Sequence, residues 1–299
     1  MQALNLTDDL RSRLNKARAG GLKIGFVPTM GNLHDGHISL VEAARKECDV
    51  VVVSIFVNPL QFGINEDLDT YPRTLEDDKA LLASHGCDIL FSPSVREMYP
   101  DGKGIATIVD MPELSQLHCG ISRPQFFKGV ATVIVKLLCM VQPDIAYFGE
   151  KDRQQLTIVR QVINDLSIPV RITGVATKRA ASGLALSSRN NYLSEEELQI
   201  AASLYQVLLD VCRQLQSGSQ DYLRLESEAS QKLATLGFVP DYFHICQQQS
   251  LLPVQPDDQN ITILAAANLN GTRLIDNIAF DLCDLYSDFQ PFNQQADLV

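Results

Sequence analysis

The sequence has no tryptophan, only five histidines and a deficit of positive charge. Its 299 residues include 25 lysines and arginines against 36 aspartates and glutamates, a formal net charge of −11. A strongly acidic protein is repelled by the phosphates of nucleic acids and by anionic lipid surfaces. The composition therefore argues against a general nucleic-acid or membrane-surface binder, although cations gathered in one place could still hold a small anion.

Cysteine clusters and long apolar runs are also missing. No two of the seven cysteines lie closer than twenty positions, which leaves no CxxC pair and no dense disulfide framework. The opening stretch, "MQALNLTDDLRSRLNKARAGG", has no apolar core of a signal peptide and reads as a surface helix. No apolar run reaches membrane-spanning length. These absences favour a protein of the reducing cytoplasm that binds no membrane.

What is present is a regular alternation of strand-like and helix-like segments over residues 1–177. The strands are expected at 23–29, 51–57, 88–93, 144–149 and 170–177, and the helices at 38–47, 74–86, 129–142 and 152–166. Such alternation is typical of an α/β fold, here a Rossmann-like, doubly wound parallel sheet with helices on both faces.

The pattern changes after residue 177. Two helices are expected at 193–218 and 221–236, followed by strands at 241–247, 261–269 and 272–280. The dipeptide "NG" at 270–271 predicts a hairpin between the last two strands. Residues 178–280 are therefore expected to form a smaller C-terminal α+β domain, and residues 281–299 a polar tail.

Polar and cationic loops follow four of the predicted strands. They are "PTMGNLHDGH" after the first strand, "NPLQFG" after the second, "GEKDRQQ" after the fourth and "LALSSRN" after the fifth. Because parallel strands end at one edge of a sheet, and ligands bind there in open α/β sheets, we expect these loops to converge on an active site.

The histidines His34 and His37 stand three residues apart where a strand gives way to a helix. They could be a metal pair, but only Asp35 nearby could add a ligand. They could also be solvated loop residues. The third interpretation is anion recognition, because imidazole donors join the free N–H groups of a helix N-terminus and Gly36 lets the backbone approach. The H-x-G-H pattern after "PTMG" favours the third.

The other loops supply matching groups, each of which also has a purely structural explanation. Lys151 offers a point charge for phosphate, and "SSRN" offers two hydroxyls, a guanidinium and backbone donors for a triphosphate. Asn58 and Gln61 suit hydroxyl and carboxylate groups. Asp77 and Asp78 could hold Mg²⁺ through water, or could be favourable charges early in a helix.

The order of these motifs resembles one family. "FVPTMGNLHDGH", "VVVSIFVNPLQFG", "YPRTLEDD", "KGVATVIVKL", "VQPDIAYFGEKDRQQL" and "GLALSSRNNYLS" are similar to motifs of the pantoate–beta-alanine ligases (pantothenate synthetases), members of the HIGH-motif nucleotidyltransferase superfamily. The resemblance extends over roughly residues 20–280. It implies that the carboxylate of (R)-pantoate attacks the α-phosphate of ATP, giving pantoyl adenylate and pyrophosphate. The amine of beta-alanine then displaces AMP to give pantothenate.

The resemblance also implies roles for individual residues. Catalytic contacts to the ATP phosphates fall to His34, His37 (as proton donor), Lys151 and Arg189, with Ser187 and Ser188 beside them. The wider ATP pocket would include Met30, Gly31, Asn32, Leu33, Asp35, Gly36, Gly149, Glu150, Asp152, Lys178 and Leu186. Gln61 and Gln155 would hold pantoate, with Gln61 also near the beta-alanine site. Asn58 joins them by the chemistry of its amide alone, and Asp77 and Asp78 stay candidates for the Mg²⁺ that accompanies ATP. The small domain would act as a lid that shields the adenylate from water.

Some positions depart from the pattern of the family, and some alternatives stay open. Gln125 and Phe126 stand where Gly-His is common, and Ala176, Lys178 and Ser182 replace more familiar residues. Another nucleotidyltransferase, which releases pyrophosphate but never AMP, is the first alternative. A non-catalytic nucleotide-binding regulator is the second. The resemblance further implies a homodimer, without indicating its interface.

Overall fold

The structure is a computed structural model that describes residues 1–63, 66–100 and 107–282. The chain divides into two compact units, one comprising Met1–Lys178 and the other beginning at Arg179. The boundary expected from the sequence follows residue 177. The expected polar tail lies outside the described residues from position 283 onward.

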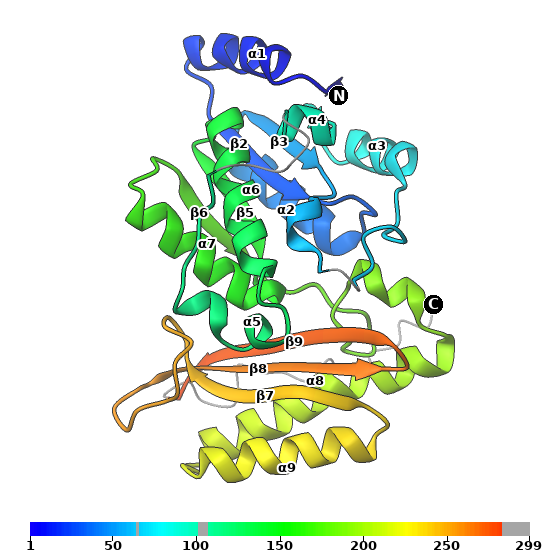
Figure 1. Cartoon of the computed structure of the whole chain (residues 1–299), viewed down its shortest axis with the longest axis vertical. Coiled ribbons are helices and arrows are strands. Elements are labelled where there is room, and N and C mark those ends of the chain that lie inside the picture. The colour runs from blue at the N-terminus through cyan, green and yellow to red at the C-terminus, as the bar shows by residue number, and fades with distance from the viewer. Residues whose placement is uncertain (64–65, 101–106, 283–299) are drawn as a thin grey trace, which may run out of the picture. The chain divides into compact units, whose positions relative to one another are not determined.

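A six-stranded sheet forms the centre of the first unit (Figure 1). Its strands are β1 (Gln2–Leu4), β2 (Ile24–Thr29), β3 (Val50–Ile55), β4 (Ile89–Phe91), β5 (Ile145–Gly149) and β6 (Arg171–Val175). They lie in the order β1-β4-β3-β2-β5-β6, and every neighbouring pair is parallel. The chain winds from β2 through β3 to β4 on one side, and from β5 to β6 on the other. The predicted Rossmann-like fold is confirmed.

Side chains of the sheet alternate between two apolar cores. In β3, Val50 and Val52 belong to one core, and Val51 and Val53 belong to the other. Successive side chains of a strand point to opposite faces, so a run of valines is what a strand covered on both faces needs. The sheet therefore has helices on both sides.

The helices of the first unit divide between these two cores. They are α1 (Thr7–Ala19), α2 (Asp35–Glu47), α3 (Leu75–Ser84), α4 (Val95–Met98), α5 (Cys119–Ser122), α6 (Phe126–Val141) and α7 (Arg153–Asp165). Apolar residues of α1, α6 and α7 pack in the first core, and those of α2 and α3 in the second. Gly129 of α6 brings its backbone against the turn after β3, because an added Cβ would lie 2.3 Å from the carbonyl oxygen of Leu60.

Two elements of the first unit differ from the sequence analysis, and the second of them bears on function. The short strand β1 was not expected, because three residues are too few for an alternating pattern to show. Helix α2 begins at Asp35, three residues earlier than expected, so His37 lies in its first turn. The segment Phe126–Val141 forms helix α6 despite its β-branched residues. The helix was expected because an apolar segment of this length is too long for an average strand.

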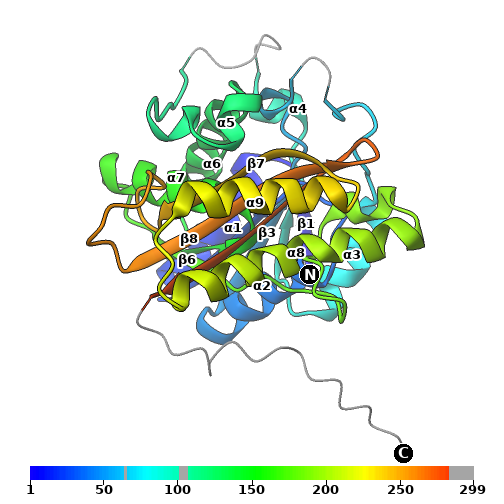
Figure 2. The same cartoon turned by 90° about the horizontal axis from the view of Figure 1, so that it is seen from below.

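The second unit is a three-stranded antiparallel sheet with two helices on one face. Its elements are α8 (Glu195–Gln216), α9 (Tyr222–Thr235), β7 (Val239–Gln247), β8 (Asn260–Leu269) and β9 (Thr272–Asp281). Figure 2 shows α8 and α9 running along the sheet, with which they share a core. The predicted "NG" hairpin is confirmed, since Asn270 and Gly271 both have positive φ.

No described helix combines the length and apolar character that crossing a lipid bilayer requires.

Candidate active site

The direction of chain winding reverses between β2 and β5 in the sheet of the first unit. Strand β2 connects to β3 on one side, whereas its other neighbour, β5, connects to β6 on the opposite side. The loops that follow β2 and β5 therefore lie at the point where open α/β sheets bind their ligands, outside the carboxyl ends of these strands. These loops are "MGNLH" and "GEKD", two of the four predicted from the sequence.

The two histidines cap the N-terminus of α2 with their own side chains. His34 is the N-cap residue, and its Nδ1 accepts a hydrogen bond from the N–H of Gly36 at 3.1 Å. His37 reaches back, and its Nδ1 accepts from the N–H of His34 at 3.3 Å. The two ring centroids are 4.1 Å apart. This is a capping box in which imidazoles take the places of the usual hydroxyl and carboxylate.

The capping bonds assign the tautomer of both rings. A nitrogen that accepts a hydrogen bond carries no proton, so the proton of each neutral ring is on Nε2. Each ring therefore presents an Nε2–H donor, and its single in-plane lone pair is already used. Zinc binding would need that lone pair, so the metal-pair interpretation of His34 and His37 does not fit this geometry.

Both rings are neutral near pH 7. Burial is the largest cause that lowers the pKa of His34 from 6.5 to about 4, and the charge of Lys151 is the second. Burial, then the neighbouring His34 and Lys151, lower the pKa of His37 to about 3. The neutral ring of His37 offers its Nε2–H as a hydrogen-bond donor, and proton donation by His37 stays a prediction.

The "GEKD" loop lies beside the histidines, as the sequence predicts. It forms the short 3₁₀ turn η3 (Glu150–Asp152) immediately before α7. The charge of Lys151 acts on the pKa of both rings, and the charge of Asp152 acts on that of His34 in the opposite direction. The charge of Lys151 is therefore felt at both imidazole rings.

The turn after β3, η1 (Pro59–Gln61), brings Gln61 to Met30. Gln61 Nε2 donates to Met30 Sδ at 3.0 Å. Asn58, which the sequence analysis places at the substrate, is buried and makes hydrogen bonds within the protein. Its Nδ2 donates to Gln61 Oε1 at 3.2 Å and to the Gly129 carbonyl at 3.1 Å, and its Oδ1 accepts from the Tyr99 hydroxyl at 2.7 Å. These bonds give Asn58 the role of orienting Gln61.

The first turn of α7 contains one structural and one candidate binding glutamine. Gln154 is buried, accepts from the N–H of Cys119 and donates to two carbonyls of the preceding segment. Gln155, which was predicted to bind pantoate, is partly exposed at the start of the same helix. Gln155 thus lies in the helical turn that directly follows the "GEKD" loop.

The two aspartates of α3 do not form a paired magnesium site. Asp77 is exposed, whereas the Asp78 side chain is 2% exposed and accepts hydrogen bonds from the backbone N–H groups of Asn32 and Leu33. Within the described ranges, no three or more His, Cys, Asp or Glu side chains are grouped to hold a metal ion. The donor set of this pair therefore does not fit Mg²⁺.

The fourth predicted loop belongs to the second unit. Ser187 precedes the 3₁₀ turn η4 (Ser188–Tyr192), and its Oγ accepts from the N–H of Arg189 at 3.3 Å. Asn190 Nδ2 donates to the carbonyl of Ala185 at 3.0 Å and closes the loop on itself. Leu186, Ser187, Ser188 and Arg189 are all partly exposed.

A buried ion pair supports this loop. The guanidinium of Arg179 donates to both oxygens of Asp276, at 2.6 and 2.9 Å, and lies 3.5 Å from the ring centroid of Tyr205. Arg179 also forms an isolated antiparallel bridge with Ala185. The segment before Ser187 is therefore fixed to β9.

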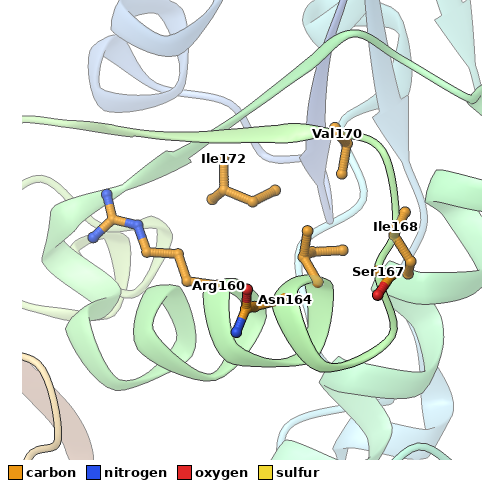
Figure 3. Close-up of a pocket in the computed structure, with 7 residues that line it drawn as sticks. Arg160, Asn164, Ser167, Ile168, Val170 and Ile172 are labelled. Atoms are coloured by element: carbon orange, nitrogen blue, oxygen red, sulfur yellow. The ribbon is translucent and has the colours of Figure 1, made fainter.

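A hollow of about 530 Å³ lies elsewhere in the first unit (Figure 3). Arg160 and Asn164 of α7 line it together with Ser167 and Ile168 of the following loop, and Val170 and Ile172 line it from the side of β6. Val170 and Ile172 stand at the start of β6, whereas ligands bind at strand carboxyl ends in such sheets. None of the predicted site residues lines this hollow.

The family of the chain follows from comparison with known proteins. The sequence model of the pantoate-beta-alanine ligase family matches residues 2–279. The chain belongs to this ligase family. The pantothenate synthetase of Hahella chejuensis is 52% identical over 282 residues, which is 94% of this chain and 100% of the relative. A pantothenate synthetase of Pseudomonas aeruginosa is 51% identical with the same coverage.

Solved structures of the ligase family agree with this fold. A pantothenate synthetase from Thermus thermophilus is 44% identical and superposes with a TM-score of 0.86 over 93% of this chain and 99% of its own. A pantoate-beta-alanine ligase from Francisella tularensis, described as complexed with beta-gamma ATP and beta-alanine, is 37% identical with a TM-score of 0.78. It covers 93% of this chain and 97% of its own length.

Residues that depart from the usual ligase pattern flank the predicted site. Gln125 is the N-cap residue of α6, and the ring of Phe126 lies 3.7 Å from the guanidinium carbon of Arg123. Arg123 in turn donates to the carbonyl of Gln61 at 3.3 Å. Lys178 is exposed and is the last residue of the first unit.

Three supporting residues were missed or misjudged in the sequence. Tyr99, which orients Asn58, and Arg179, which fixes the Ser187 segment, carry no local signal because their partners are far away in the chain. Asp78 was identified, but its backbone bonds were not foreseen. Asp77 and Asp78 are adjacent aspartates in the first turn of α3, and the sequence pattern does not indicate which of them is buried.

Proposed function

We propose that this ligase joins (R)-pantoate to beta-alanine with the first half-reaction at the carboxyl ends of β2 and β5. A carboxylate oxygen of pantoate attacks the α-phosphorus of ATP, the bond from that phosphorus to the bridging oxygen breaks, and pyrophosphate leaves with the electron pair. The amine of beta-alanine then attacks the acyl carbon of pantoyl adenylate and expels AMP. The amine loses one proton, and the products are pantothenate, AMP and pyrophosphate.

The observation that carries this proposal is the pair of neutral imidazoles at the start of α2. Their Nε2–H groups, with the ammonium of Lys151 beside them, are donors of fixed direction at a helix N-terminus. Phosphoryl transfer develops charge on the phosphate oxygens, and preorganised donors stabilise it without reorganisation. A binding module that only recognises a nucleotide has no need for donors arranged around a reacting phosphorus.

The polar turn at Gln61 is proposed to recognise the acyl substrate. Gln61 contacts Met30 in the loop after β2 and is oriented by Asn58, so its amide is held next to that loop. Pantoate presents a carboxylate and hydroxyls, which an amide recognises through its donor and acceptor. We assign Gln61 and Gln155 to pantoate, with Gln61 also near beta-alanine.

The remaining assignments rest on chemistry. Ser187, Ser188 and Arg189 are proposed to contact the triphosphate, since hydroxyls and a guanidinium suit phosphate oxygens. Mg²⁺ is proposed to arrive with ATP as part of the substrate, where it would offset the negative charge of the phosphates. We also propose that the protein is a homodimer, which the resemblance to the family implies, and that it is cytoplasmic, which its composition favours.

Exchange of labelled pyrophosphate into ATP tests this function. The assay contains the protein, MgATP and labelled pyrophosphate, with or without pantoate, and omits beta-alanine. We expect exchange only with pantoate, because reversal of the first step requires the pantoyl adenylate. Adding beta-alanine should then release AMP. Exchange without pantoate would indicate a different nucleotidyltransferase, and no exchange by folded protein would contradict the ligase mechanism.

A further inference from the structure

The loop before the histidines has an unusual backbone. Gly31 and Asn32 have φ angles of +86° and +51°, in the left-handed region. Glycine adopts this region without strain, whereas asparagine does so only at some cost. Such conformations persist where surrounding groups hold them. The turn from β2 into α2 therefore needs an external support.

That support comes from Asp78 in the first turn of α3. Its Oδ2 accepts from the N–H of Asn32 at 3.0 Å, and its Oδ1 accepts from the N–H of Leu33 at 2.8 Å. The Thr74 hydroxyl donates to Oδ1 at 3.2 Å. With a side chain that is 2% exposed, Asp78 is a buried carboxylate balanced by these donors. Two successive peptide groups of the loop are thus bound to one rigid group.

The packing leaves this carboxylate little freedom. A Cβ added at Gly31 would lie 3.1 Å from Asp78 Oδ2 and 3.0 Å from Ile55 Cγ2. The loop and the carboxylate are therefore in close contact, and a glycine is required at this point. Leu33, the second residue bound by Asp78, immediately precedes the N-cap residue His34. A shift of the loop would consequently move both imidazoles.

We propose that Asp78 is a positioning residue for the first half-reaction. It fixes the turn that aims His34 and His37, and it acts through their backbone without touching a substrate. This inference rests on the proposed function of the two histidines. It replaces the metal-ligand role predicted from the sequence, since the carboxylate faces the loop and its neighbour Asp77 is exposed.

The test compares Asp78→Asn with Asp77→Asn in the pyrophosphate exchange assay. Asparagine at position 78 keeps the size of the side chain but turns an N–H₂ donor toward a backbone N–H. We expect kcat to fall about 10–100-fold, because small displacements of catalytic groups have costs of this order. The Mg²⁺ concentration for half-maximal rate should not change, and Asp77→Asn should resemble the unchanged protein.

Two outcomes would overturn the proposal. One is an Asp78→Asn variant with unchanged kcat. The other is a lost rate that high Mg²⁺ restores, which would make the carboxylate a metal ligand. If Asp78→Asn folds poorly, the double variant with Asn32→Gly decides, because glycine adopts the left-handed conformation without support. Recovery of rate supports positioning, and no recovery in the folded double variant contradicts it.

Amide hydrogen exchange separates this inference from the proposed function. The amides of Asn32 and Leu33 should be protected in the original protein and in Asp77→Asn, and should lose protection in Asp78→Asn. This readout does not depend on activity. If the original protein showed no pantoate-dependent exchange of pyrophosphate, the function would fail while the support by Asp78 could still be judged. Unchanged protection in Asp78→Asn would refute the support itself.

Discussion

The two loops proposed to hold the ATP phosphates are supported in different ways. In the first unit, the carboxylate of Asp78 binds backbone N–H groups of the loop, and the histidines cap the helix that follows. In the second unit, the support is a side-chain ion pair, in which Arg179 meets Asp276. One loop is held by its peptide groups, and the other is held through a side chain at its base.

The two kinds of support should respond differently to substitution. A carboxylate that accepts backbone bonds has no replaceable partner, so even an amide of the same shape disturbs the loop. A buried ion pair has two partners, and removing one leaves an uncompensated charge. Removing both can be much less harmful, because the desolvation of both charges disappears together. The first loop should therefore be disturbed even by an isosteric replacement of Asp78. The second should be disturbed most when only one partner of the Arg179–Asp276 pair is removed.

The largest expected effect is on the reaction rate. Lys151→Met and Arg189→Met each remove a cation proposed to contact phosphate, and we expect either to lower the exchange rate by about 10²–10³-fold. The controls are Lys46→Met, at the exposed far end of α2, and Arg224→Met, on the exposed surface of α9. If Lys151→Met lowered the exchange rate and Arg189→Met did not, the proposed contact between Arg189 and the phosphates would be wrong.

The ion pair of the second unit should show strong coupling. Arg179→Met should lower the free energy of unfolding by about 3–5 kcal/mol, because Asp276 would remain buried and unpaired. Adding Asp276→Leu should lower it by less than the sum of the two single changes. Urea unfolding followed by circular dichroism measures these values. Additive losses would mean that the pair does not act as a unit.

A smaller effect is expected at Ser187, which precedes η4. Ser187→Ala removes the acceptor for the N–H of Arg189 and should cost about 0.5–2 kcal/mol. Ser194→Ala removes a similar bond from the capping box of α8 and should cost about the same. Only Ser187→Ala should also raise the KM for ATP. An equal rise in KM for both would show that it reflects stability alone.

The smallest expected change is one of titration. In the free protein, the ring signals of His34 and His37 should not titrate between pH 5.5 and 8, because their pKa values lie at about 4 and about 3. NMR spectra of the imidazoles measure this. The unfolded chain takes up these protons below about pH 6.5, so stability should decline as the pH falls from there toward the folded pKa values.

The variant His37→Gln sharpens this prediction. Glutamine cannot be protonated, so the variant should lose less stability on acidification from about pH 6.5 to 4 than the original protein. Urea unfolding at several pH values gives the comparison. A steeper loss in the variant, or a ring signal of His34 or His37 that titrates near pH 6.5, would contradict neutral buried rings.

The fold was largely predictable because its signals are local. Valines of β3, the "NG" turn at 270–271 and the Ser194 capping box each carry their meaning within a few residues. Strand β1 escaped because it is stabilised by pairing with β4 rather than by its own three residues. The sequence predicted which loops belong to the candidate site, because loops that follow parallel strands lie at the same edge of the sheet.

The supports of the site were not predictable, because they join residues distant in sequence. Asp78 binds Asn32 across 46 positions, Tyr99 binds Asn58 across 41, and Arg179 binds Asp276 across 97. An aspartate in a first helical turn is ordinary, and its preference for a helix N-terminus explains it without any further contact. The burial that distinguishes Asp78 from Asp77 exists only after α3 packs on the loop.

The capping of α2 by imidazole nitrogens has a stereochemical consequence. Each ring has its only in-plane lone pair bound to a backbone N–H, so neither can attack phosphorus without breaking the helix cap. A nucleotidyl-histidine intermediate is therefore closed to this pair, and we expect the adenylyl group to pass to pantoate in a single in-line displacement. ATP made chiral at the α-phosphorus should yield an adenylate of inverted configuration.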